Sequence, residues 1–157
     1  MAVEKNRNVI ISLTEITTRP FHYRLQFSGL TGQLKKLDVV YDNGDSSCKA
    51  QFNGDKMTVY KDKTNMIVYT GGYAYIPPFS LFLHGEGTLY SHGIKNYSGE
   101  FVYSRKQGDG RFYYKNGRIK YDGKWNNDLP HGNGCIYSAI SDKSSMYFLF
   151  NALCPSG

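Results

Sequence analysis

The chain has no long apolar run and no leucine- or alanine-rich helical periodicity, and both absences narrow the classes it can belong to. None of its 157 residues lies in a stretch approaching the roughly 18–20 apolar residues of a membrane-spanning helix. Residues 1–8 are largely polar and form no apolar signal segment, so we expect a protein that is not secreted. The aromatic content is high instead, mainly because of tyrosine and phenylalanine.

Cysteine and histidine are also scarce. Cys48, Cys135 and Cys154 are odd in number and widely spaced. This spacing suits reduced thiols in the cytosol better than a disulfide framework or a metal site. No two of the 4 histidines have the spacing of metal ligands. We therefore expect neither a metal site nor a cofactor.

The patterns of common catalytic sites are missing as well. The Gly-x-Gly segments are not followed by Lys-Ser or Lys-Thr, and no helix follows to supply its N-terminus, which argues against a nucleotide site. Asp109, Asp122 and Asp142 stand at expected turns or outward positions and form no acid pair. The sequence therefore predicts a protein without catalytic activity.

The most informative feature of the chain is a sequence motif that occurs three times. It reads Tyr-x-Gly-x-aromatic, a gap, and then Gly-x-Gly. The copies start at Tyr69, Tyr97 and Tyr121, and their Gly-x-Gly segments start at Gly85, Gly108 and Gly132. The last two copies are 24 residues apart, and self-similarity at such a step indicates a repeat architecture. Stacked identical units build surfaces rather than one special cleft.

Each copy predicts a β-hairpin. In a strand, Tyr97, Gly99 and Phe101 point to one face, and the glycine leaves space for a neighbouring ring. The Gly-x-Gly is expected to begin the second strand, and Asn116-Gly117 is a strong tight-turn signal. A hairpin of roughly 20–24 residues cannot bury its own aromatic face, so it is stable only when stacked on its neighbours.

The repeated motif resembles the MORN (membrane occupation and recognition nexus) repeat. Residues 121–134 match that pattern almost completely, with its Tyr-x-Gly-x-Trp and His-Gly-x-Gly. Residues 97–117 depart by Phe101 in place of Trp and Gln107 in place of His. Residues 69–93 carry extra residues, including consecutive prolines, which we interpret as a loop. At the His or Gln position we expect a hydrogen-bonding role near the turn, shared by His84, Gln107 and His131.

The predicted fold is all-β: an open, single-layer array of antiparallel hairpins with edge-capping strands at its ends. We expect one domain over residues 1–157, with three clear repeats in residues 69–137 and degenerate repeats in residues 23–68. An ordinary antiparallel meander is the alternative for the degenerate part. Residues 138–157 are the predicted C-terminal cap, with a strand over 146–150, and residues 9–13 can cap the other end.

The resemblance implies a scaffold or adaptor that binds a helical or extended partner segment in an aromatic-lined concave face. The residues expected to line this face are Tyr69, Tyr73, Tyr97, Phe101, Tyr121 and Trp125. Aromatic residues are enriched at binding hot spots. The alternative is that these rings are only the packed spine of the sheet.

The charge pattern offers a second class of function. The net charge is +6, and much of it gathers in a basic stripe of Arg105, Lys106, Lys115, Arg118 and Lys120. Such a stripe can bind an anionic membrane, including the phosphoinositides that the resemblance implies, or an acidic partner. It can equally be a solvated face.

We expect no nucleic-acid binding, because the aromatic rings are already used by the repeat. A structural role in a cytoskeletal, ciliary or viral assembly is the third hypothesis, and self-association stays open. The expected location is cytoplasmic, with or without association to the cytoskeleton or a membrane.

Overall fold

The protein is all-β in the computed structural model, which describes residues 3–4, 21–27, 33–41, 46–61, 64–76, 80–139 and 144–149. These residues form twelve strands and contain no α-helix. No helix that could cross a membrane is present among them. The strands are β1 (Val3–Glu4), β2 (Phe21–Phe27), β3 (Leu34–Tyr41), β4 (Ser46–Asn53), β5 (Lys56–Lys61), β6 (Met66–Ile76), β7 (Ser80–Ser91), β8 (Ile94–Val102), β9 (Arg105–Tyr113), β10 (Ile119–Asn126), β11 (Leu129–Tyr137) and β12 (Ser144–Leu149).

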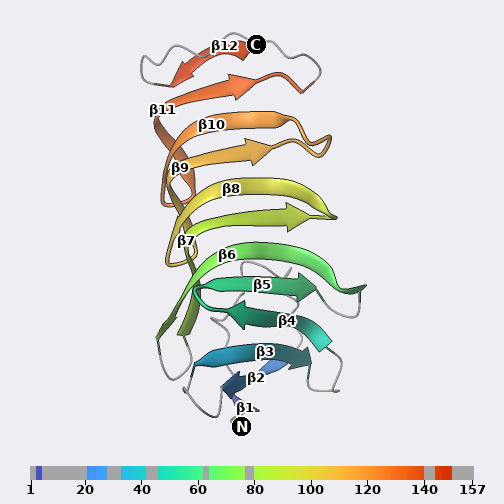
Figure 1. The fold of residues 1–157 in the computed structure, drawn as a ribbon. Helices are drawn as coiled ribbons and strands as arrows, with labels where there is room; N and C mark the ends of the chain where they lie inside the picture. Colours follow the sequence, from blue (N-terminus) through green and yellow to red (C-terminus); the bar gives the residue numbers. More distant parts are fainter. Residues whose placement is uncertain are drawn as a thin grey trace. The chain divides into compact units, whose positions relative to one another are not determined.

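The chain packs as two compact units, residues 1–82 and 83–157. In the first unit, each strand from β1 to β6 pairs antiparallel with the next one along the chain. In the second unit, the same sequential pairing runs from β7 to β12 (Figure 1). The predicted fold class, an open single layer of consecutive antiparallel hairpins, is therefore confirmed.

The two sides of the second unit's sheet differ in composition. We call inner face the side to which Tyr97, Gly99 and Phe101 point, and outer face the side that carries Ser98 and Glu100. The inner positions of β8 are buried, whereas the outer ones are half-buried. This is the alternation expected when one face of a strand is packed.

The two units build their cores from different residues. The buried core of the second unit is mostly aromatic, and its members are Leu83, Tyr97, Phe101, Tyr121, Trp125 and Cys135. The first unit is mostly aliphatic, with Leu34, Leu37, Cys48, Ala50, Met57, Val59, Tyr69 and Leu81. The clear repeats therefore pack rings where the first unit packs smaller side chains.

The position of the Gly-x-Gly segment corrects one expectation. It does not begin the second strand of a hairpin but lies within it: β9 already begins at Arg105, and Gly110 pairs with both Gly99 and Gly123. The glycines of neighbouring strands face each other because a tyrosine ring needs the space over both of them. The expected turn after β9 is present, with Gly117 at φ 86°, a conformation that favours glycine.

Three further expectations concern the edges and a loop. The predicted strand at residues 146–150 is present as β12, which pairs with β11 through Leu149 and Gly134. The predicted strand at residues 9–13 and the proline loop at residues 77–78 lie outside the described residues.

Candidate partner-binding face

The first tyrosine of each repeat lies flat over a pair of glycines. A Cβ added at Gly99 would lie 2.7 Å from the hydroxyl oxygen of Tyr97, and still closer to the backbone of Asp109 and Gly110. A Cβ at Gly110 would overlap the Tyr97 ring itself. The Tyr97 hydroxyl donates a hydrogen bond to the Glu100 carbonyl at 3.0 Å. The glycines are therefore needed because the ring fills the space of their missing side chains.

The next repeat uses the same arrangement. The Tyr121 ring covers Gly123 and Gly134, and its hydroxyl donates to the Lys124 carbonyl at 2.7 Å. In the first unit, the Tyr69 hydroxyl donates in the same way to a carbonyl three residues later, at 2.6 Å. The hydroxyls are thus satisfied by the backbone of their own strand, and their rings belong to the packed interior.

Trp125 connects two successive repeats. Its ring makes edge contacts with Tyr97 and Tyr121, with both centroid separations at 5.3 Å and interplanar angles of 88° and 83°. Its indole N–H donates to the Gly110 carbonyl at 3.0 Å. Edge-to-face aromatic pairs contribute about 0.5–1.5 kcal/mol beyond their buried area. The sole tryptophan of the chain is therefore the link between the hairpins β8–β9 and β10–β11.

The structure shows where the six predicted lining residues lie. Tyr69, Tyr97, Phe101, Tyr121 and Trp125 are each at most 6% exposed. Only Tyr73 is half-buried; it packs against Phe52 at 4.8 Å and donates to the Gly54 carbonyl at 3.0 Å. The five buried rings occupy the position of a spine, and a role for them in contacting a partner stays a prediction.

Two other rings bring aromatic surface to the inner face. Phe112 pairs with Tyr97 on one side and Tyr121 on the other, makes an edge contact with Trp125 at 6.2 Å, and is only half-buried. Tyr114 is half-buried too and donates to the Tyr137 carbonyl at 2.9 Å. The sequence did signal Phe112 as an inward residue, since it stands two places after a repeat glycine.

Two lysines lie over these rings. The Nζ atom of Lys106 is 5.4 Å from the ring centroids of Tyr97 and Trp125, and 5.7 Å from that of Phe112. Lys120 Nζ is 5.5 Å from the centroid of Phe112 and 5.6 Å from that of Tyr114. These are cation–π distances. The inner face therefore carries two ammonium groups above an aromatic floor.

Lys106 is the more enclosed of the two. Burial lowers the pKa of its ammonium group, and the charge of Asp128 partly opposes that shift. One Asp128 carboxylate oxygen accepts a hydrogen bond from the Lys106 backbone N–H at 2.8 Å. Within the described part of the chain, no ion pair involves the side chain of Lys106 or of Lys120.

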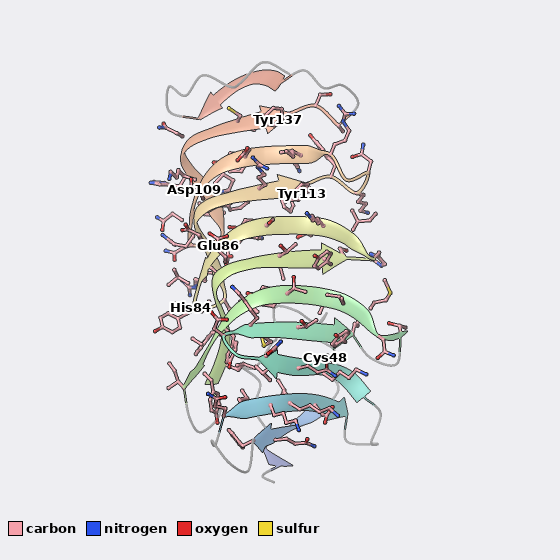
Figure 2. All side chains as sticks on the ribbon, in the orientation of Figure 1. Cys48, His84, Glu86, Asp109, Tyr113 and Tyr137 are labelled. Atoms are coloured by element: carbon pink, nitrogen blue, oxygen red, sulfur yellow. The ribbon has the colours of Figure 1, made fainter. Side chains whose placement is uncertain are left out.

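The rest of the predicted basic stripe is divided. Arg105 and Lys115 are exposed, and Arg118 is half-buried. On the outer face, two other cations are paired across β9 and β10: Arg111 Nε with Asp122 at 3.0 Å, and Lys124 Nζ with Asp109 at 2.7 Å. In Figure 2, Asp109 and Glu86 are labelled at the left of the sheet, and Tyr113 and Tyr137 lie further to the right. The five cations of the stripe thus differ in exposure, and their contact with a membrane or an acidic partner stays a prediction.

The comparison with known families agrees with this geometry. The MORN repeat model matches residues 97–117 and 121–143. The chain carries MORN repeats. The first match contains the hairpin β8–β9 without the first residues of β8, and the second contains most of β10 and all of β11. A search of curated proteins finds no relative that matches this chain.

The variable His or Gln position of the MORN repeats joins successive hairpins. His84 Nδ1 accepts a hydrogen bond from the Tyr103 N–H at 3.2 Å, and the two rings lie tilted against each other with their centroids 4.7 Å apart. In the next repeat, Gln107 Oε1 accepts from the Asn127 N–H at 3.0 Å. The expected hydrogen-bonding role near the turn is therefore observed for His84, through an imidazole, and for Gln107, through an amide; for His131 it stays a prediction. In Figure 2, His84 and Glu86 are both labelled at the left of the view.

Backbone bonds complete this junction between hairpins. Ser104 N–H donates to the Leu83 carbonyl at 2.8 Å, and the Leu83 N–H donates to Ser104 Oγ at 3.0 Å. One repeat later, Asp128 N–H donates to the Lys106 carbonyl at 3.1 Å, reciprocating the bond to its carboxylate. The turns of the hairpins β8–β9 and β10–β11 are thus each held on the strand before the hairpin.

The described residues show no constellation of a catalytic or metal site. No group of three or more His, Cys, Asp or Glu side chains among them could hold a metal ion. Cys48 is a free thiol, fully buried, and burial raises its pKa to about 12, which makes it a poor nucleophile. Cys135 is disulfide-bonded, so the expectation of reduced thiols is wrong for this residue. MORN repeats in general occur in non-enzymatic elements.

Proposed function

We propose that this protein, whose MORN repeats indicate a scaffold or a membrane-associated protein-binding module, is a non-enzymatic scaffold whose inner face binds a segment of a partner protein. The observation that carries this proposal is the half-buried surface of Phe112 and Tyr114, which lies beside the packed spine of Tyr97, Tyr121 and Trp125. Aromatic residues on a preorganised surface are typical of binding hot spots, because little side-chain freedom is lost on binding.

The buried rings and the half-buried rings have different roles in this proposal. The buried rings hold successive hairpins in register, through the contacts of Trp125 with two tyrosines. The half-buried rings Phe112 and Tyr114 are two positions apart, at the end of β9 and directly after it. A helical or extended segment laid across the strands would meet one row of apolar and aromatic side chains, which runs Leu89, Tyr97, Phe112, Tyr121 and Ile136.

A photo-crosslinker at two adjacent positions tests this proposal. p-Benzoylphenylalanine would replace Phe112 on the inner face or, as the matched control, Tyr113, the next residue of β9, whose side chain alternates to the outer face. Irradiation in the native cell should give a protein adduct from position 112 and little from position 113. Equal yields at both positions, or adducts to lipid alone, would overturn the proposal.

An anionic membrane is the second candidate, favoured by the exposure of Arg105 and Lys115. Each such residue near an anionic bilayer contributes about 1 kcal/mol to binding. Vesicles with and without phosphatidylserine, sedimented with the protein at low and high salt, separate the two. A steep salt dependence supports membrane binding, and no sedimentation supports a protein partner. A cytoplasmic location and self-association belong to the same proposal and need their own measurements.

A further inference from the structure

Lys106 and Lys120 place two positive charges on the inner face. We propose that this face selects a partner segment rich in carboxylate side chains, and that Lys106 and Lys120 bind those carboxylates. The inference deepens the proposed scaffold function, on which it rests, by naming the kind of segment that is bound and the residues that choose it.

The first argument is the placement of two like charges on one ring. Lys106 Nζ and Lys120 Nζ lie 5.7 and 5.5 Å from the centroid of Phe112. Both ammonium groups therefore lie beside the ring of Phe112. Charges of the same sign on one face repel each other, and an anionic segment that passes along this face relieves the repulsion. The inner face is therefore complementary to negative charge.

The second argument is the contrast between the two faces. On the outer face, the chain supplies Asp122 to Arg111 and Asp109 to Lys124. On the inner face, the nearby carboxylate of Asp128 bonds to the backbone N–H of Lys106. Among the described residues, the ammonium groups of Lys106 and Lys120 lie over rings and form no ion pair, and the charge of Asp128 acts on Lys106 only from beyond ion-pair distance.

The third argument is hydrogen-bonding capacity. An ammonium group has three N–H donors, and an aromatic ring attracts its charge without offering a strong acceptor. Donors of Lys106 and Lys120 are therefore left for a ligand. A carboxylate meets this need with charge-assisted hydrogen bonds, which are among the strongest in proteins.

The burial of Lys106 favours a protein segment over a bilayer. This side chain is half-buried beside Tyr97 and Trp125, so a flat membrane surface reaches it less easily than a single carboxylate side chain does. A bilayer would meet exposed cations such as Arg105 and Lys115 first. The partner implied by the inner face is an acidic segment with apolar or aromatic residues between its carboxylates.

Fluorescence of Trp125 provides the test, because it is the sole tryptophan of the chain and Lys106 Nζ lies 5.4 Å from its ring centroid. The probes are synthetic peptides of alternating Glu and Ser, of Gln and Ser, and of Lys and Ser, with inorganic phosphate as a free anion. Only the Glu–Ser peptide should change the Trp125 emission at low concentration. Its affinity should fall as salt rises.

Variants then assign the binding to the two lysines. The double variant Lys106→Met, Lys120→Met keeps the apolar stems and should weaken binding of the Glu–Ser peptide by about tenfold or more, the loss expected for charge-assisted hydrogen bonds. Arginine at both positions should retain the binding. The control Lys124→Met removes a cation of the outer face and should leave the affinity unchanged. If the double variant unfolds, Lys120→Met alone decides, since Lys120 is exposed.

The outcomes separate this inference from the function it rests on. Equal binding of the Gln–Ser and Glu–Ser peptides, no binding of either, or full binding by the lysine variants overturns the selection of carboxylates. If position 112 still crosslinks to a protein in that case, the scaffold function stands without the acidic preference. Loss of both results would remove both proposals. Vesicles that bind through Lys106 and Lys120 while the peptide does not would assign the two lysines to lipid instead.

Discussion

The substitution Gly123→Ala tests whether the repeat glycines exist to make room for a ring. The added Cβ would lie 2.6 Å from the Tyr121 hydroxyl oxygen and 2.6 Å from the Asn133 carbonyl oxygen. The hydroxyl can move only by giving up its 2.7 Å hydrogen bond to the Lys124 carbonyl. The Asn133 carbonyl belongs to β11, so its displacement disturbs the pairing of β10 with β11.

The expected loss of stability combines two effects. Overpacking a well-packed site costs roughly 1–3 kcal/mol, and loss of the tyrosine hydrogen bond adds about 1 kcal/mol. We therefore expect the free energy of unfolding to fall by roughly 2–4 kcal/mol. For a small unit this is a large share of the total stability. Gly99→Ala should behave alike, because its Cβ would meet the Tyr97 hydroxyl in the same way.

Urea unfolding followed by Trp125 emission measures this change in the second unit. The matched control is Gly117→Ala, whose Cβ would meet nothing within 4 Å but whose φ is 86°. This control adds backbone strain without overlap and should cost about 1–2 kcal/mol. If Gly123→Ala is as stable as Gly117→Ala, or more stable, then the glycine is not a packing site and the account of the tyrosine ring fails.

The other predictions concern three single residues. Trp125→Phe leaves a carbonyl of β9 without its donor, so chemical denaturation should show a loss of about 1–3 kcal/mol; an unchanged midpoint would contradict the link between repeats. His84→Gln should be tolerated because Gln107 fills the same role, whereas His84→Leu removes the acceptor of the Tyr103 N–H and should cost about 1–3 kcal/mol in thermal unfolding; equal melting of the two variants would refute this. Cys48, whose pKa burial raises to about 12, should resist iodoacetamide at neutral pH until the protein unfolds. Its contribution to stability is complete below the ordinary pKa of a thiol and is lost as the pH rises toward 12, so unfolding curves that do not weaken in that alkaline range would oppose this assignment.

The fold was predictable because its signals are local. Alternation in residues 97–101 places Tyr97, Gly99 and Phe101 on one face, as the structure has them. The turn at Asn116-Gly117 needs a positive φ, and the sequence places a glycine there. The equivalence of His84 and Gln107 also followed from their common position in the repeat. The structure does not test whether residues 23–68 are degenerate repeats.

The division of the rings into spine and surface was not predictable, because it depends on contacts between strands. Alternation predicts that Tyr97 and Phe112 lie on the inner face, but it does not predict which of the two rings is buried. Tyr97 is buried since it lies over Gly99 and Gly110, and this follows from the register that pairs those two glycines. Phe112 has no such pair beneath it and is left half-buried.

The pairing of charges was hidden from the sequence for the same reason. Arg111 and Asp122 are opposite each other in β9 and β10, and so are Lys124 and Asp109. Lys120 stands where the register of these strands shifts, between Ile119 and Tyr121. Simple alternation fails at such an irregularity. The sequence therefore shows that basic residues cluster in this region. It does not show which of them pair with carboxylates and which lie over aromatic rings.

The hydrogen bonds that join successive hairpins cannot all be repeated after β11. Leu83 and Lys106 occupy equivalent positions, and the backbone N–H of each donates to a side-chain oxygen of the following turn, Ser104 or Asp128. The next equivalent position is Pro130, directly before His131 of the third His-Gly-x-Gly segment. Proline has no backbone N–H, so this position cannot receive a turn in the same manner. A further hairpin stacked after β11 would lack one of the bonds that fasten the earlier ones. β12, a strand of different sequence, pairs with β11 further along, from Gly134 to Tyr137. A proline at the junction thus allows the pairing of strands to continue while the repeat itself comes to an end.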